Sequence, residues 1–190
     1  MNTSKPNFKL IIGLGNPDQK YTNTHHNVGH LFVDYLNSQK LDVKNPAEGE
    51  ARPPRRDDES RLGQRRQMSK SDVYMNESGS FVKKEMRKAN AKSEELLVVH
   101  DDSDITIGNY KLSFDRGAAG HHGIESIQAV LKTNNFWRLR IGIRPAVKSE
   151  KAQAKRQKAG EFVLKKISSA NKKIIERTFD EIQTELNLKS

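Results

Sequence analysis

Histidine and aspartate gather at a few places in this sequence of 190 residues. Four of the six histidines form two doublets, in the stretches THHNVGH and GHHGIESI, and each doublet stands just before a predicted helix. His100 opens a third stretch, HDDSD, which holds three aspartates. A carboxylate beside an imidazole fixes the ring tautomer and stabilises the imidazolium, while the other ring nitrogen takes a proton from water. The sequence therefore offers the parts of a hydrolytic site that activates water.

Other hydrolytic devices are missing from the chain. It contains no cysteine, which excludes disulfides, thiolate zinc sites and cysteine nucleophiles, and no serine stands in a nucleophile-elbow context. Hydrolysis would therefore use activated water rather than a covalent intermediate. Asn16, at the end of the stretch GLGNP, suits the remaining task, because an amide both donates and accepts and can bind or polarise a carbonyl oxygen.

The elements that must position these residues follow from hydrophobic periodicity. Apolar runs and alternating patterns predict strands at 8–13, 95–100, 110–114 and 137–143, and helical spacing predicts helices at 27–40, 78–92, 123–132 and 168–189. Asn27 is a candidate cap for the first of these helices. Strands that alternate with helices imply an α/β fold, a single three-layer domain over residues 1–190 with a mixed, mostly parallel twisted sheet flanked by helices.

Ligands of such sheets bind beyond the carboxyl ends of the strands. GLGNP, HDDSD and the two histidine doublets all read as connections between elements. We therefore expect the fold to bring them together at one rim of the sheet.

The net charge of +10 is concentrated in two segments. Residues 52–70 hold seven basic and three acidic residues, which gives +4, and residues 144–166 hold eight basic and two acidic, which gives +6. This pattern favours a polyanionic partner such as RNA or DNA, bound through phosphate contacts and counterion release. The simpler interpretation is that the charge only promotes solubility.

Residues 45–71 differ from the rest of the chain, because they contain three prolines, many charges and almost no apolar side chains. Such a segment cannot bury enough surface to offset its ordering entropy, which predicts a mobile loop or a poorly ordered insert. No apolar run is long enough to span a membrane, and the first residues are too few and too polar for a signal peptide. We expect a monomer in the cytoplasm, with a mitochondrial location as the alternative.

Each of these motifs also has a purely structural interpretation. GLGNP can be an ordinary tight turn, and it lacks the third glycine of a dinucleotide fingerprint. HDDSD can be a solvated acidic turn, and GAAGHHG a loop whose glycines allow close packing. Taken together, the motifs form one cluster of histidine, aspartate and asparagine in an otherwise plain chain, which favours a functional site.

The ordered set of motifs resembles the bacterial-type peptidyl-tRNA hydrolases. IIGLGNP, YTNTHHNVG, YMNESG, VVHDDSD, GAAGHHGIESI, FWRLRIGI and GEFVLKK occur in that family's order and at roughly its spacing, over most of residues 10–164. The resemblance implies a single α/β domain around a mixed sheet. It also implies cleavage of the ester between a peptide and its tRNA, without a metal or a cofactor.

The resemblance implies roles for individual residues as well. His26 matches the catalytic base, Asp101 the carboxylate that supports it, and Asn16 the amide that contacts the substrate near the scissile ester. The glycines of GLGNP would then let the backbone come close to the substrate.

A second group of positions matches the residues that surround the substrate in the family. Those around the peptide and the 3′-terminal nucleotide are Tyr21, Tyr74, Met75, Asn76 and His122. Those that hold phosphates of the tRNA acceptor arm are Lys111 and Arg140, with Arg116 beside a basic position of the family that Ser113 occupies here.

The chain departs from the family pattern at three places. His122 stands where the family usually has asparagine, although a neutral imidazole also supplies one donor and one acceptor. The family commonly has proline and threonine shortly before Tyr-Met-Asn, whereas this chain has Ser71 and Val73 in that run. The paired strands that precede Tyr-Met-Asn in the family have no convincing counterpart in residues 45–71.

Two other functions remain open from the sequence. A metal-dependent phosphoesterase or nuclease would use the histidine doublets together with His100, Asp101, Asp102 and Asp104 as nitrogen and oxygen ligands, although no spacing here is diagnostic. A non-catalytic tRNA-binding protein would have kept the fold and lost the activity, as His122 and the altered run before Tyr74 suggest.

Overall fold

Five strands form one mixed sheet in the computed structural model, which describes residues 6–43, 66–145 and 162–188. Their order across the sheet is β2-β1-β3-β5-β4. The first four run parallel to one another, and β4 pairs antiparallel with β5. The strands are β1 (Leu10–Gly13), β2 (Gln67–Lys70), β3 (Leu96–Thr106), β4 (Tyr110–Phe114) and β5 (Trp137–Arg144).

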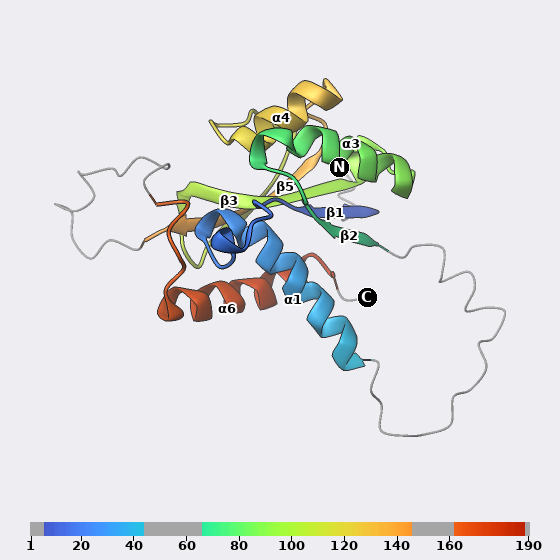
Figure 1. Ribbon diagram of the computed structural model, residues 1–190. Helices are drawn as coiled ribbons and strands as arrows, with labels where there is room; N and C mark the ends of the chain where they lie inside the picture. The colour runs from blue at the N-terminus through green and yellow to red at the C-terminus, as the bar shows by residue number, and fades with distance from the viewer. Residues whose placement is uncertain (1–5, 44–65, 146–161, 189–190) are drawn as a thin grey trace, which may run out of the picture.

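Helices cover both faces of this sheet (Figure 1). On one face lie α1 (Val28–Val43) and α6 (Ser169–Glu185), and on the other lie α3 (Ser78–Ala89) and α4 (His122–Leu131). Each face has its own cluster of buried apolar side chains. The expected three-layer α/β domain with a mixed, mostly parallel sheet is therefore confirmed.

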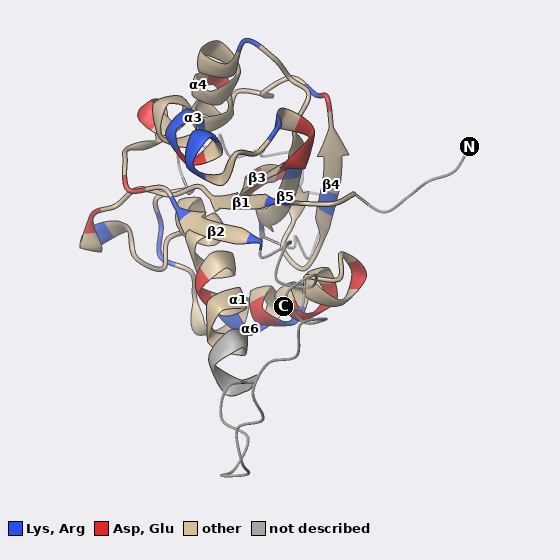
Figure 2. Cartoon of the chain, turned by 90° about the vertical axis from the view of Figure 1, so that its right-hand side faces the viewer, with Lys and Arg blue, Asp and Glu red and all other residues tan. Residues whose placement is uncertain are grey.

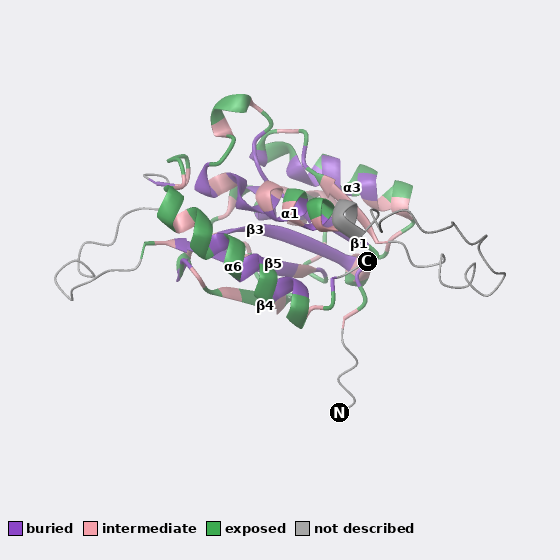
Figure 3. Ribbon diagram, turned by 90° about the horizontal axis from the view of Figure 1, so that it is seen from below, coloured by how far each residue is buried: buried purple, intermediate pink, exposed green. Residues whose placement is uncertain are grey.

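The central strands are apolar because both of their faces are covered. Every residue of β1 is buried, and so are the first six residues of β3 (Figure 3). Along β5 the side chains alternate, so that Leu139 and Ile141 pack with Phe179 of α6. Arg138 and Arg140 therefore point to the face that α3 and α4 cover.

The prediction of HDDSD as a loop was wrong, because β3 continues through this stretch to Thr106. Asp101 pairs with Ile141 and Asp102 with Gly142 in register with β5, and the register becomes irregular only after them. The polar side chains suggested a loop, but backbone pairing with β5 decides the structure, since strand formation depends on neighbours that are distant in sequence.

Part of the predicted insert at 45–71 is also a strand. Gln67–Lys70 form β2, which pairs parallel with β1 at the edge of the sheet. An edge strand is only half covered, which explains why its sequence is polar. The prediction of poor order is wrong for these residues, and residues 44–65 lie outside the described part of the chain.

The predicted helices are confirmed, with bounds that differ from the predicted ones by about four residues or fewer. The expected helix at 78–92 ends at Ala89, because Asn90 takes a left-handed conformation at φ 47°. The expected helix at 168–189 is α6, which ends at Glu185. None of the helices in the described ranges is both long and apolar enough to cross a bilayer.

The glycines of GLGNP and of the following helix allow α1 to pack directly on β1. A methyl group at Gly13 would stand 2.2 Å from the carbonyl oxygen of Gly29, and one at Gly29 would stand 2.4 Å from that of Val99. A methyl group at Gly15 would overlap the ring of His30 at 2.8 Å. The close approach that these glycines permit in the structure is thus to α1 and β3.

We expect Gly13→Ala to lower the free energy of unfolding by about 1–3 kcal/mol, because the added methyl group has only backbone and a packed side chain to displace. Urea denaturation of the purified variant measures this loss. Gly117→Ala is the matched control, because its methyl group would meet no atom within 4 Å. Equal denaturation midpoints for the two variants would contradict the proposed close packing.

Candidate active site

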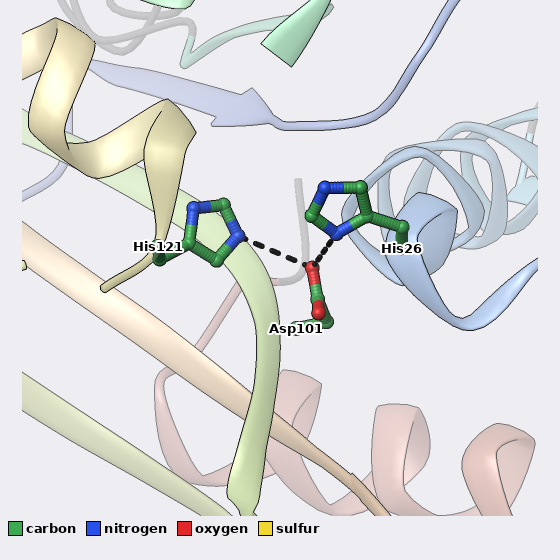
Figure 4. Close-up of side chains that lie close together, drawn as sticks. All are labelled: His26, Asp101 and His121. Atoms are coloured by element: carbon green, nitrogen blue, oxygen red, sulfur yellow. Dashed lines mark hydrogen bonds and ion pairs between the residues drawn. The ribbon is translucent and has the colours of Figure 1, made fainter. Parts of the chain in front are cut away.

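One carboxylate oxygen binds two imidazoles at the carboxyl end of the sheet (Figure 4). Nδ1 of His26 lies 2.7 Å from Oδ1 of Asp101, and Nε2 of His121 lies 3.2 Å from the same oxygen. His26 belongs to a short 3₁₀ turn, His25–Asn27, that leads into α1, whereas His121 is the N-cap of α4. Three segments that are far apart in sequence therefore meet at the side chain of Asp101.

The hydrogen bonds of the two histidines determine their tautomers. Nδ1–H of His26 donates to the carboxylate of Asp101, which leaves Nε2 with a lone pair that can accept a proton. Nδ1 of His121 accepts the backbone N–H of Ile124 at 3.4 Å, so its Nε2–H donates to Asp101. Of these two rings, that of His26 is therefore the one with a nitrogen free to act as a base.

Electrostatic effects favour a charged Asp101 beside a basic His26. Burial opposes ionisation of Asp101, but the hydrogen bonds from His121 and His26 outweigh it and hold the pKa of this carboxyl well below its usual value. Burial also opposes the charged form of His26, yet the hydrogen bond and the negative charge of Asp101 outweigh that effect and raise the pKa of His26 above 6.5.

The C-terminal segment positions the turn that carries His26. The backbone N–H of His26 donates to the carbonyl of Val163 at 2.8 Å, and Nδ1–H of His25 donates to the carbonyl of Lys165 at 3.0 Å. The ring of Phe162 packs edge-on against that of His25. Phe162, Val163 and Lys165 of the motif GEFVLKK, which carries no obvious chemistry, thus hold the histidine doublet in place.

Asn27 ties the turn after β1 to the same histidine turn. Its Oδ1 accepts the backbone N–H of Asn16, and its Nδ2–H donates to the carbonyl of Asn16, both at 2.9 Å. The expectation that Asn27 caps α1 was therefore wrong, because both polar atoms of its side chain bind Asn16 instead. Oδ1 of Asn16 accepts the backbone N–H of Met75 at 3.1 Å, and the Asn16 Nδ2 group remains as its donor.

Ser71 holds the other side of this turn. Its buried hydroxyl accepts the N–H of Gly15 at 3.1 Å and donates to the carbonyl of Gly15 at 2.9 Å. Because that proton is used, Nε2–H of His30 donates to the same hydroxyl at 3.0 Å. Burial, followed by repulsion from Lys70, lowers the pKa of His30 to about 4, so this ring stays neutral near pH 7.

A pocket of about 580 Å³ opens beside the paired histidines. Its wall includes His26, Asp101 and His121, and its basic residues are Arg116, Arg138 and Arg140. Nε of Arg140 donates to Asp102 at 2.7 Å. Nη1 of Arg138, a side chain only 2% exposed, donates to the carbonyl of Gly117 at 2.8 Å and so holds the connection that leads into α4.

A family model described as peptidyl-tRNA hydrolase matches residues 10–189. The chain belongs to the peptidyl-tRNA hydrolase family. A protein named peptidyl-tRNA hydrolase from Lactobacillus johnsonii is 34% identical over 189 residues, which cover 95% of this chain and 91% of that protein. One of the same name from Aquifex aeolicus is 35% identical over 170 residues, which cover 88% and 82%.

Solved structures agree with this assignment. A crystal structure of peptidyl-tRNA hydrolase from Acinetobacter baumannii superposes with a TM-score of 0.71 at 25% identity, covering 99% of this chain and 91% of that one. The resemblance that the ordered motifs indicated is thus confirmed.

Five of the residues that the family resemblance assigned line the pocket, namely His26, Asp101, Arg116, His122 and Arg140. Asn16 is not part of the wall and connects to His26 through Asn27. Lys111 lies opposite Arg140 in the register between β4 and β5, which places the two cations side by side on one face of the sheet.

The four remaining assigned residues lie outside the pocket wall. Met75 is buried, and its sulfur lies 2.5 Å from the place that a methyl group on Gly123 would occupy. Tyr74 is 44% exposed, and its hydroxyl donates to Asp18 at 2.8 Å. Asn76 is exposed in the short 3₁₀ turn Met75–Glu77, and Tyr21 contacts Lys20.

His121 is the residue that sequence reasoning missed, because it assigned a role only to the second histidine of GHHG. The N-cap position of His121 turns its side chain back toward Asp101, whereas His122, one residue further on, points outward with 80% of its side chain exposed and binds Glu125. Because consecutive residues at the start of a helix point in different directions, the two rings lie apart. The histidine doublet in GHHG was the sequence feature that could have pointed to His121.

Only part of the ligand set of the metal hypothesis comes together in the described residues. Nδ1–H of His100 donates to the carbonyl of Asp101, and the carboxylates of Asp102 and Asp104 bind Arg140 and Arg144. The members of that set whose ligand atoms lie within 4.8 Å of one another are His26, Asp101 and His121.

The contact with Asp101 can be tested directly by titrating the imidazole of His26. NMR should give a pKa above 6.5 for His26. Asp101→Asn should lower this pKa, because burial would still disfavour the charged imidazolium while the negative charge of Asp101 that stabilises it would be gone. Glu125→Gln is the matched control, since it removes a carboxylate that binds His122 and not His26. An unchanged His26 titration in Asp101→Asn would show that the pair is not formed.

We expect Ser71→Ala to lower the free energy of unfolding by about 1–3 kcal/mol, because it leaves the N–H and C=O of Gly15 unpaired in a buried position. Ser38→Ala removes an exposed hydroxyl and should change stability by no more than about 0.5 kcal/mol. Thermal or urea denaturation compares the two variants. Similar stability of both variants would argue against the two hydrogen bonds between the Ser71 hydroxyl and the backbone of Gly15.

Proposed function

We propose that this chain hydrolyses the ester between a peptide and the 3′-terminal ribose of tRNA, with His26 as the base that activates water. The observation that carries the proposal is the 2.7 Å bond between Nδ1 of His26 and Asp101, which leaves Nε2 free beside a pocket. Membership of the peptidyl-tRNA hydrolase family supports peptidyl-tRNA as the substrate.

The proposed reaction has two proton transfers at His26. Nε2 takes a proton from water as the water oxygen attacks the ester carbonyl, which forms a tetrahedral intermediate and an imidazolium. The bond from the carbonyl carbon to the ribose oxygen then breaks, and the imidazolium returns the proton to that oxygen. The products are a peptide with a free carboxyl group and a tRNA with a free ribose hydroxyl.

Asp101 and His121 act through His26 in this proposal. The charged Asp101 stabilises the imidazolium and keeps Nδ1 protonated. His121 donates to the same oxygen and so fixes the orientation of the carboxylate. His121 is therefore a positioning residue.

Asn16 is suited to bind the ester carbonyl as negative charge develops on it. The backbone N–H of Met75 donates to Oδ1 of Asn16. The Nδ2–H group of Asn16 is therefore the one available to a substrate oxygen. The turn that carries Asn16 is held by Asn27 and Ser71, which keeps the amide from reorganising during the reaction.

The substrate would lie across the rim of the sheet on both sides of His26. Residues proposed to contact the peptide and the 3′-terminal nucleotide are Tyr21, Tyr74, Met75, Asn76 and His122. Phosphates of the acceptor arm would bind Lys111, Arg116 and Arg140, which is supported by the shared face of Lys111 and Arg140 and by the two arginines in the pocket wall. The monomeric state and the cytoplasmic location stay predictions from the sequence.

Cleavage of an N-blocked aminoacyl-tRNA tests the proposal. His26→Ala should lower the rate by about 10²–10⁴, the contribution of a positioned acid–base group, while Lys172→Ala on the distant α6 should keep the rate of the unmodified protein. The rate should also fall as the pH drops through the raised pKa of His26, because only the neutral ring accepts a proton.

Three outcomes would contradict this assignment. An undiminished rate in His26→Ala would rule out the proposed base. Loss of activity with a chelator and its recovery with a divalent ion would favour metal-assisted hydrolysis at His26, Asp101 and His121. Salt-sensitive tRNA binding without turnover would favour a non-catalytic tRNA-binding protein.

A further inference from the structure

Four cations line a hollow on the outer side of α3, away from the pocket beside His26. Lys83, Lys84, Arg87 and Lys88 are all exposed, and with Ser80 and Val130 they border a groove of about 520 Å³, called here the α3 groove. Figure 2 shows the basic side of α3. No acidic side chain lines this groove.

The helix period explains why these cations share one face. Their positions follow the spacing i, i+1, i+4 and i+5, which forms one stripe along a helix. The opposite face is buried through Phe81, Val82 and Glu85. The one acidic residue of α3, Glu85, is only 5% exposed and turns toward Gln67 and Ser69 of β2.

Little in the described residues neutralises this charge. Lys88 forms an ion pair with Glu85 at 2.6 Å, whereas Lys83, Lys84 and Arg87 have no ion pair within the described ranges. Three cations within two helical turns repel one another, so an anionic partner that binds all three would be favoured.

The α3 groove lies on the same side of the sheet as the cations of the pocket. Arg140 and Lys111 point away from α6, toward the face that α3 and α4 cover. Between the two basic regions lies α4, whose one acidic residue, Glu125, is paired with His122. A single polyanion could therefore contact both regions without meeting an unpaired carboxylate on α4.

We propose that the α3 groove binds backbone phosphates in the duplex part of the tRNA whose 3′ end occupies the active site. The proposal rests on the proposed function. The turn that carries Asn76, proposed to lie at the 3′-terminal nucleotide, leads directly into α3. At 1.5 Å per residue, Lys83 lies about 8 Å along the helix from Ser78, so the groove begins close to the substrate end.

The groove offers both kinds of phosphate ligand. Lysine binds as a point charge, whereas the guanidinium of Arg87 can bind two phosphate oxygens at once. Phosphate contacts position an RNA without reading its sequence. The α3 groove would therefore raise affinity for tRNA in general and would not select particular tRNAs.

The test compares two substrates and two triple variants. Lys83→Ala, Lys84→Ala and Arg87→Ala are combined in one protein. The matched control combines Lys172→Ala, Lys173→Ala and Arg177→Ala, which removes the same charge from exposed positions with a similar spacing on α6, across the sheet. Each protein cleaves an N-blocked aminoacyl-tRNA and an N-blocked aminoacyl ester of a short single-stranded 3′-end oligonucleotide.

The α3 triple variant should raise the KM for full-length tRNA by about tenfold and lower the slope of log binding constant against log salt by about 2 to 3, as expected for three lost phosphate contacts. Its cleavage of the short oligonucleotide should not change. The α6 triple variant should resemble the unmodified protein with both substrates.

Three other results would overturn the proposal. An unchanged KM and salt slope would show that the groove is only solvated, and equal effects of the two triple variants would show a non-specific effect of net charge. Equal effects on both substrates would place the contact at the 3′ end. If the unmodified protein cleaved neither substrate, the proposed function would fail, and salt-dependent binding of deacylated tRNA would still test the groove by itself.

Discussion

The shared hydrogen bond of two imidazoles to one oxygen of Asp101 organises this molecule. A buried carboxylate is costly unless it is paired, and removal of its partners leaves an uncompensated charge. His26 comes from the turn before α1 and His121 from the start of α4, which lie in opposite helical layers. The same contact that makes His26 basic thus also links the two layers across the end of the sheet.

The turn after β1 depends on polar contacts of a different kind. The N–H of Leu14 still donates to Val99 of β3, whereas the buried N–H and C=O groups of Gly15 and Asn16 are satisfied by side chains. The amide of Asn27 and the hydroxyl of Ser71 each bind both an N–H and a C=O group of this turn. Because these contacts leave one amide group of Asn16 as a donor, the packing of the turn also prepares it for a substrate.

The alternation of β5 divides structural and binding roles between its two faces. Leu139 and Ile141 pack toward α6, while Arg138 and Arg140 point to the face where the pocket opens. On that face one arginine holds the connection before α4, and the other is oriented by Asp102. A period of two residues therefore lets a single strand serve both the core and the pocket.

The sequence by itself determined the class of fold, the approximate bounds of the helices and the family, because apolar periodicity and ordered motifs are local properties. It also identified His26 and Asp101, which the structure brings into contact. Only the tertiary structure decided that HDDSD and residues 67–70 are strands, that His121 and not His122 binds Asp101, and that Asn27 binds Asn16. The reason is physical: strand pairing and the partner of a buried polar group are chosen by segments that are distant along the chain, and no local pattern records them.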